Sequence, residues 1–160
     1  MPIVLPLPPR LRSSIPSVTT AAIALLSSQL AGQKPDGSPV PVYDGDMSSD
    51  VPDEFVVVGG VSNGQQVWGA IGTQRRNEHF DIDCMVRVWA GGDAQAPLRQ
   101  RCFDLLALIE LALVQDPSLG GTVNGAVQFS ASDCRWGPLD GGRYCEADFT
   151  LSVVTQLIAQ

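Results

Sequence analysis

The sequence predicts a single α+β domain: a mixed, mostly antiparallel β-sheet, two main helices packed on one face of it, and a long C-terminal β-hairpin. Three stretches carry this prediction: an alternating strand at Glu78 to Trp89, a helix from about Ala96 to Val114, and a returning strand at Arg143 to Leu157. Strands that are apolar on one side only, with helices able to cover that side, are typical of the α+β class. A chain of 160 residues, of which 44% are hydrophobic and 17% charged, is long enough for one folded core.

Residues 1–16 are expected to form an extended N-terminal arm, and residues 17–160 the domain itself. The arm holds five of the twelve prolines of the chain, and proline breaks regular helices and favours extended conformations. The arm lacks the basic and apolar pattern of a signal peptide, and no apolar run reaches the roughly 20 residues that a membrane span needs. The protein is therefore expected to be soluble and cytoplasmic when made, without a membrane partner.

The first helix is predicted from Ser17 to Ala31, with Ser17 as its cap and Gly32 after its end. Apolar residues recur in it at helical spacing, and no residue from Val18 to Ala31 is charged. A helix without charge on any side needs cover, either from its own sheet or from a partner.

An acidic loop is expected at residues 33–54, with a short strand near Val40 to Tyr43. Part of this loop imitates the start of a calcium-binding loop. However, Ser49 stands where that loop needs glycine, and Phe55 stands where it needs a bidentate glutamate. We therefore predict a solvated acidic loop rather than a metal site.

The continuous apolar run Phe55 to Val58 predicts a buried strand that ends at Gly59-Gly60. The following segment is expected to be a hairpin or loop that leads into a strand around Val67 to Ile71. Arg75 to Asn77 is expected to be a polar turn.

The strand from Glu78 to Trp89 is the clearest element of the sequence. Successive side chains of a strand point to opposite faces. Its predicted apolar face consists of Phe80, Ile82, Cys84, Val86 and Val88. Its predicted polar face carries His79, Asp81, Asp83 and Arg87.

The helix from about Ala96 to Val114 begins with Pro97 in its first turn. Its core-facing stripe is predicted to be Leu98, Cys102, Leu105, Leu106, Ile109 and Leu113. Phe103, Leu108, Leu111 and Ala112 lie outside this stripe, so the second half of the helix is apolar nearly all round, apart from Glu110. Such a helix needs cover on more than one side, and in a domain this small we expect another subunit to supply the second cover.

The C-terminal hairpin is predicted to follow a turn at Asp116 to Gly121, with one strand at Thr122 to Ser132 and a long tip at Asp133 to Gly142. The tip holds Trp136 and Pro138. Aromatic side chains in a hairpin either pack locally or anchor an interface. The predicted subunit interface is therefore Phe103, Leu108, Leu111, Trp136 and Pro138.

Four acidic residues are predicted to share the polar side of the sheet: Asp81, Asp83, Glu146 and Asp148. The net charge of -7 and the isoelectric point near 4.4 also argue against a surface that holds nucleic acid through its phosphates. If copies form a ring with this side inward, the acidic bore would repel DNA and let it slide without sticking. Arg87 dilutes this charge but does not cancel it.

The sequence offers no catalytic, cofactor-binding or metal-binding constellation. His79 is the only histidine, and together with Asp81 and Asp83 it is better explained by a solvated strand face than by a general base. The four cysteines lack the spacing of a zinc site and are expected to be reduced. A disulfide between Cys134 and Cys145, which flank the predicted hairpin tip, stays an open alternative.

In their order along the chain, several of these pieces resemble the tail terminator proteins of long-tailed bacteriophages, also described as minor tail or tail completion proteins. They are the early helix, Pro-Val-Tyr-Asp-Gly at 41–45, Phe-Val-Val-Val-Gly at 55–59, the strand and helix that follow, and Asp-Pro-Ser-Leu-Gly-Gly at 116–121. The resemblance covers residues 17–157, and the Leu-Gly-Gly turn is its most specific part. The Pro-rich arm and the cysteines near the hairpin tip fall outside it.

The resemblance implies a structural virion protein without a reaction, a cofactor or catalytic residues. It implies a homo-oligomer, most simply a hexameric ring, at the head-proximal end of the tail. Such a ring stops polymerisation of the tail tube protein and joins the tail to the head–tail connector or stopper protein, while DNA passes through its lumen without specific binding. It implies assembly in the host cytoplasm and a final place in the neck region of the virion.

Other functions remain open on the sequence alone. Within the virion, the chain could be another neck component, such as a head–tail connector or stopper, or a tail tube protein, which ordinarily shows a more strand-rich pattern. From other classes, a small hydrolase lacks a recognisable nucleophile here, and a free binding module would stay monomeric when tail tubes are present.

Overall fold

The computed structural model describes residues 13–47, 50–68 and 75–158. The chain forms two helices and five strands within these ranges. They are α1 (Ile15–Gln29), β1 (Val42–Asp44), β2 (Glu54–Trp68), β3 (Arg75–Gly91), α2 (Gln95–Gln115), β4 (Val127–Leu139) and β5 (Gly142–Ile158). The predicted α+β class is confirmed. Most of the predicted N-terminal arm, part of the calcium-like loop and residues 69–74 lie outside the described residues.

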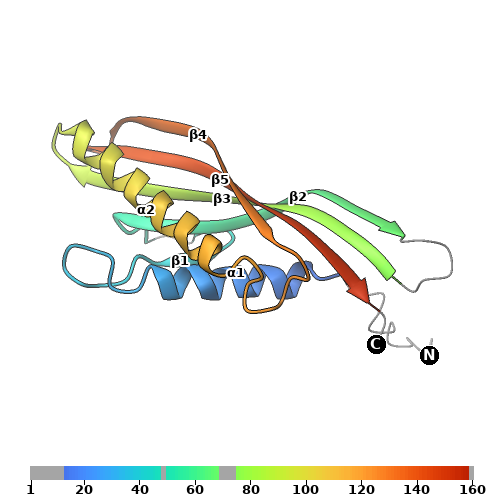
Figure 1. The fold of residues 1–160 in the computed structure, drawn as a ribbon. Coiled ribbons are helices and arrows are strands. Elements are labelled where there is room, and N and C mark those ends of the chain that lie inside the picture. Colours follow the sequence, from blue (N-terminus) through green and yellow to red (C-terminus); the bar gives the residue numbers. More distant parts are fainter. Residues whose placement is uncertain (1–12, 48–49, 69–74, 159–160) are drawn as a thin grey trace, which may run out of the picture.

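The strands form one sheet in the order β1-β2-β3-β5-β4. β1 pairs with β2 in parallel, and the other neighbours are antiparallel. Both helices lie on the same face of this sheet, as Figure 1 shows. We call the covered side the helix face and the other side the outer face. Neither helix in the described part of the chain has the length and apolar character needed to cross a bilayer.

The core lies between the helix face and the two helices. The alternation predicted for β3 is confirmed, because Phe80, Ile82, Cys84, Val86 and Val88 are each at most 5% exposed. The stripe predicted for α2 is also confirmed, since each of its six residues is buried. α1 adds Val18, Ala22 and Leu26, all fully buried. The sequence periodicity therefore identified the correct side of each of these elements.

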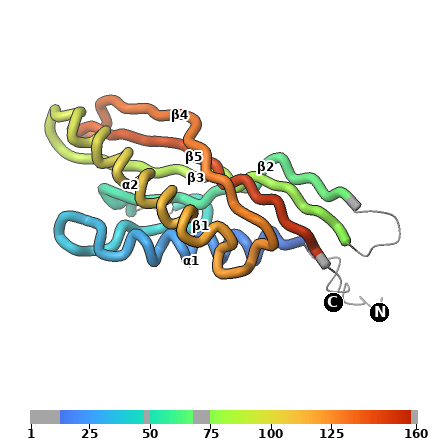
Figure 2. Tube along the Cα trace, in the orientation of Figure 1, coloured from blue at the N-terminus to red at the C-terminus, as the bar shows by residue number. Residues whose placement is uncertain are grey.

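Strand β2 does not end at Gly59-Gly60, as the sequence predicted. The two glycines stand opposite Asp83 alone and form a β-bulge. The pairing with β3 then resumes, passes a second irregularity between Ser62 and Gln65, and continues to Trp68. An added Cβ on Gly59 would lie 2.8 Å from the backbone oxygen of Asp83, so this close approach requires glycine. The predicted polar turn at Arg75 to Asn77 is likewise wrong, because these residues belong to β3. The ends of β2 and β3 consequently run on past the helices (Figures 1 and 2).

The predicted long hairpin tip at residues 133–142 is also wrong. β4 continues to Leu139, and only Asp140 and Gly141 connect it to β5. Both residues have positive φ, 45° and 76°, as a two-residue type I′ turn requires. Asp-Gly is a strong signal for this turn, and it was present in the sequence.

Helix α1 begins at Ile15, two residues before the predicted start, and Pro16 lies in its first turn. Ser14 is the cap, not Ser17, so the boundary between arm and domain moves into the segment that was assigned to the arm. The shift has a tertiary cause: Glu78 of β3 accepts hydrogen bonds from the Ser14 amide at 2.8 Å and from the Ser14 hydroxyl at 2.5 Å. A carboxylate at this end of the helix also complements the helix dipole.

Candidate assembly surface

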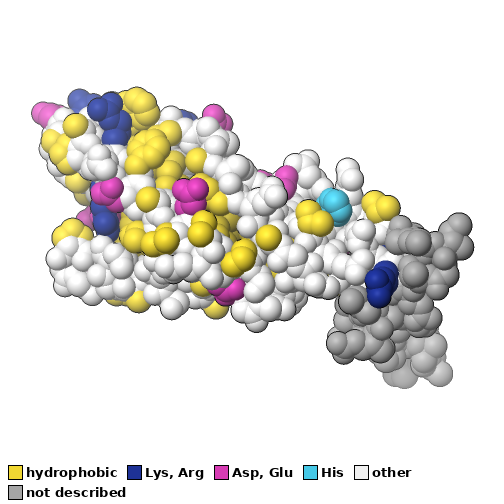
Figure 3. All heavy atoms as spheres, in the orientation of Figure 1, with side chains coloured by type: hydrophobic (Ala, Val, Ile, Leu, Met, Phe, Trp, Pro, Cys, Tyr) yellow, Lys and Arg dark blue, Asp and Glu magenta, His cyan; other side chains and the backbone are white. Residues whose placement is uncertain are grey.

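Large apolar side chains are exposed along the flank of α2 that lies beside β4. Phe103 is 50% exposed, Val114 70% and Trp136 48%, and Phe129 is partly buried between them and the core. Phe103 and Val114 lie about three helical turns apart and so on the same flank of the helix. We call Phe103, Val114, Phe129 and Trp136 the α2–β4 strip. Figure 3 shows hydrophobic side chains gathered over α2 and β4 at the upper left of the molecule.

A β-bulge in β4 places Trp136 on this side. Ser132 and Asp133 together stand opposite Asp148, so the alternation of β4 reverses after them. Trp136 therefore pairs in register with Cys145, whose side chain points to the helix face. The guanidinium of Arg99, from α2, lies 5.2 Å from the centre of the Trp136 ring. This cation–π contact holds the indole beside α2 while leaving half of it exposed.

The five residues of the predicted interface do not form one patch. Phe103 and Trp136 belong to the strip, and Pro138 is exposed two residues further along the helix face of β4. Leu108 is partly buried against the protein's own core. It lies two turns after Arg101, which bonds to Gln33 and Glu54, so it faces the α1 side of α2. Leu111, 45% exposed, points to solvent between the two flanks.

The four predicted acidic residues do lie together on the outer face. Asp81 and Asp83 of β3 pair in register with Ser152 and Thr150 of β5, and the same side of β5 carries Glu146 and Asp148. Their environments differ, however, because arginines from the neighbouring strands reach two of the four.

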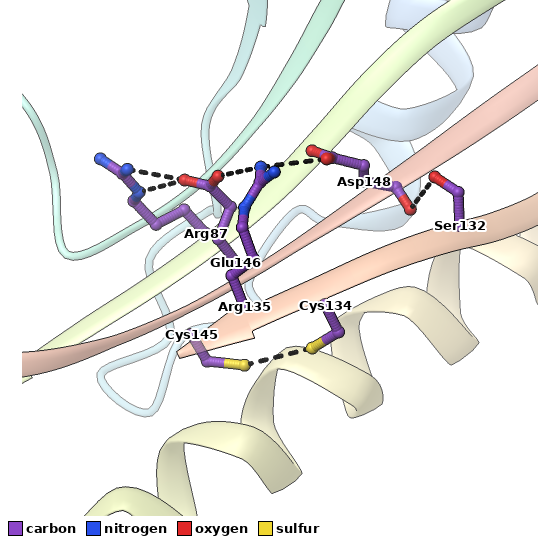
Figure 4. A network of polar contacts seen from close by, with 7 residues as sticks. All are labelled: Arg87, Ser132, Cys134, Arg135, Cys145, Glu146 and Asp148. Carbon is purple, nitrogen blue, oxygen red and sulfur yellow. Dashed lines mark hydrogen bonds and ion pairs between the residues drawn. The ribbon is translucent and has the colours of Figure 1, made fainter. Parts of the chain in front are cut away.

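Glu146 is the centre of an ion-pair network on the outer face (Figure 4). Its carboxylate, in a residue only 7% exposed, lies 2.6 Å from a guanidinium nitrogen of Arg87 and 2.6 Å from one of Arg135. Arg135 also lies 3.0 Å from Asp148. The hydrogen bond with Glu146 raises the pKa of Arg135. The network links β3, β5 and β4, and it neutralises charge that the sequence assigned to an acidic surface.

Asp81 and Asp83 keep their charge free of these arginines. Asp81 accepts a hydrogen bond from the side-chain amide of Asn63 at 2.8 Å. Hydrogen bonds from Ser152 and Asn63 lower the pKa of Asp81, so the carboxylate stays ionised. Asp83 is exposed and lines an open groove together with Asp46 and Asp148. The outer face is therefore acidic along its middle and neutralised towards Glu146.

Sequence reasoning missed Glu78, which is the most buried charged residue of the described chain, at 1% exposure. It lies on the helix face of β3, where its carboxylate accepts hydrogen bonds from Ser13, Ser14 and Gln66. Burial alone would raise the pKa of the Glu78 carboxyl, but these hydrogen bonds outweigh burial and lower it. The sequence did carry a signal for this burial. Glu78 stands two residues before Phe80 and four before Ile82, and therefore on the same side of the strand.

The remaining chemistry-bearing residues are dispersed. His79 is exposed on the outer face, in register with Gln65 and Val154. Among the described residues, no group of three or more His, Cys, Asp or Glu side chains is placed to hold a metal ion.

Comparisons with protein-family models and with curated proteins gave no match to this chain.

Proposed function

We propose that this protein is a tail terminator: a structural virion protein that forms a ring at the head-proximal end of a phage tail, stops polymerisation of the tube and joins the tail to the head connector. The observation that carries the proposal is the α2–β4 strip. In this strip, three large apolar side chains are about half exposed or more. A small domain that stays monomeric would ordinarily cover such a surface. Aromatic anchors of this kind dominate the energy of protein interfaces.

The charges at the two edges of the sheet support contact between different surfaces of neighbouring copies, as a ring requires. The strip lies at the β4 edge, next to Arg99. The β1 edge at the other side of the sheet carries Asp44 and Asp46. A heterologous contact between the two edges would bring opposite charges together around an apolar centre.

Aspartate at the strip should abolish ring formation while the fold is kept. We expect Phe103→Asp with Trp136→Asp to remain monomeric where the native protein forms rings, because two charges would be buried at each contact. Native mass spectrometry and negative-stain images, with and without purified tail tubes, measure this. Val154→Asp is the matched control, since Val154 is 50% exposed but lies on the outer face, away from the strip.

Three results would support the proposal. The native protein and the control form rings, the double variant stays monomeric, and tails that lack this protein grow beyond their normal length. A native protein that stays monomeric and leaves tube ends uncapped would refute it.

The outer face gives a second expectation for the same function. With this face towards the lumen, Asp81→Lys with Asp83→Lys should slow DNA ejection or packaging through the neck, because the wall would then attract phosphates. The retardation should shrink as the salt concentration rises. Particles that carry the double variant and release DNA at the native rate at low salt would remove the lumen assignment, but not the ring.

A tail tube protein is the second candidate. The long strands of the sheet favour this function more strongly than the strand pattern predicted from the sequence did. β3 and β5 each contain 17 residues, and β4 is an open edge of 13. A tube protein would polymerise alone into filaments, whereas a terminator would stop at single rings and cap existing tubes.

A further inference from the structure

We propose that Cys134 and Cys145 are a disulfide site that is reduced in this structure and closes when a small disulfide oxidant is present. Their sulfur atoms lie 3.7 Å apart, directed at each other between β4 and β5 (Figure 4). All four cysteines are free thiols here. The proposal concerns the isolated subunit and does not rest on the function proposed above.

The β4 bulge creates this pair. If β4 continued from Ala131 without the bulge, Cys134 would stand opposite Glu146 and point to the outer face, since one position along a strand reverses the side. With the bulge, Cys134 pairs in register with Ala147 and points to the helix face, as Cys145 does. The two cysteines are diagonal neighbours on one side of the hairpin, with a short turn between their strands. Edge strand β4 can move towards β5 more easily than an inner strand, because only one side of it is paired.

The two cysteines differ in their exposure to solvent, and this difference assigns them different roles in the reaction. Cys134 is partly exposed, whereas Cys84, Cys102 and Cys145 are buried. Burial, followed by the hydrogen bond with Cys145, raises the pKa of Cys134 to about 11. At neutral pH the Cys134 thiol therefore stays protonated and reacts slowly, and its reaction should quicken as the pH rises, because the thiolate is the nucleophile. Cys134 is the point of entry and Cys145 the resolving thiol.

The reaction is a thiol–disulfide exchange with a small disulfide such as oxidised glutathione. The Cys134 thiolate attacks one sulfur of the oxidant, forms a mixed disulfide and releases one glutathione thiolate. The Cys145 thiol then loses its proton to solvent, attacks the sulfur of Cys134 and releases the second glutathione thiolate. The two cysteines lose two electrons and two protons, and the oxidant is reduced to two molecules of glutathione.

The bond would fix the edge of the sheet. It would tie β4 to β5 next to Trp136 and Arg135, which carry the strip and the outer-face network.

The test uses the full chain, purified in reductant and then exposed to oxidised glutathione at pH 8.5. The expected product has lost two hydrogens, keeps two of its four thiols, and gives a linked peptide that contains Cys134 and Cys145. Its midpoint of thermal unfolding should rise, because the bond restricts the conformations of the unfolded chain. The midpoint should return to the original value when reductant is added. Cys84→Ser should react like the native protein, since Cys84 lies in β3 away from the pair.

Cys145→Ser provides the second arm. It removes the resolving thiol and should trap Cys134 as a stable adduct with one glutathione. Retention of all four thiols by the native protein would overturn the proposal. So would a linked peptide that contains Cys102 in place of Cys134, or disulfides formed only between separate molecules.

Discussion

Alanine in place of Gly142 is expected to destabilise the protein by about 3 kcal/mol. Gly142 is the first residue of β5, directly after the two-residue turn. An added Cβ would overlap the backbone oxygen of Ala90 and lie 2.8 and 2.9 Å from two ring atoms of Trp89. Neither neighbour can yield easily, because Ala90 is held in the β3–β5 pairing and the Trp89 indole donates a hydrogen bond to the Leu139 carbonyl at 3.0 Å.

Gly91→Ala is a close control for this variant. Gly91 is the register partner of Gly142 in the same strand pair, and an added Cβ there has no heavy atom within 4 Å. Both variants exchange the same residue types, so the change in backbone freedom is similar. Urea unfolding followed by circular dichroism measures the difference between them. Equal midpoints would show that a small movement relieves the crowding at Gly142 and that the packing of Gly142 against Trp89 and Ala90 is not as tight as the structure has it.

The elements that could be predicted from the sequence are those whose pattern is local. β3, β5 and α2 each repeat their apolar residues at a single period over many positions, so both the type of element and its buried side were correct. The two helices were also correctly expected on one side of the sheet, because the strands offered only one apolar face to cover.

The errors lie where pairing with a distant strand decides the conformation. Gly59-Gly60 and Asp140-Gly141 both interrupt apolar patterns, yet the first is a bulge within a strand and the second is a turn. They differ in the strand beside them, because β3 remains paired with β2 on both sides of the bulge, through Cys84 and Ile82. The same holds for the Ser132–Asp133 bulge, where the sequence predicted that a strand ends at Ser132 and a loop tip begins at Asp133.

The candidate surface was predicted in part for the same reason. Phe103 was found because it breaks the helical pattern of α2, and the acidic residues were placed on the correct side by alternation. The neutralisation of Glu146 was missed because Arg135 was assigned to a loop, whereas the structure places it on a strand beside Glu146. Whether an apolar residue of α2 faces β4, α1 or solvent depends on where β4 and α1 pack. The periodicity of α2 alone does not give their positions.

Glutamine in place of Glu78 is expected to cost about 2–3 kcal/mol at pH 7 and to remove part of the acid sensitivity of the fold. The Glu78 carboxylate accepts hydrogen bonds from the hydroxyls of Ser13 and Ser14, from the Ser14 amide and from the Gln66 amide. Glutamine keeps the shape but turns one acceptor into a donor, which would face donors in a site that is 1% exposed. The start of α1 would lose its attachment to β3.

The pH dependence follows from the direction of the shift. The folded-state pKa of Glu78 lies below its ordinary value of 4.5. The stability that the carboxylate contributes is therefore fully present above about pH 5 and is lost as the pH falls through 4.5 towards the lower folded-state pKa. In Glu78→Gln this part of the acid transition should be absent, so the difference in stability between the native protein and the variant should shrink as the pH falls below 4.5. Glu110→Gln, an exposed glutamate on α2, should follow the native curve. A constant difference between Glu78→Gln and the native protein from pH 7 to pH 3 would show that the Glu78 carboxylate is not what fixes α1 to the sheet.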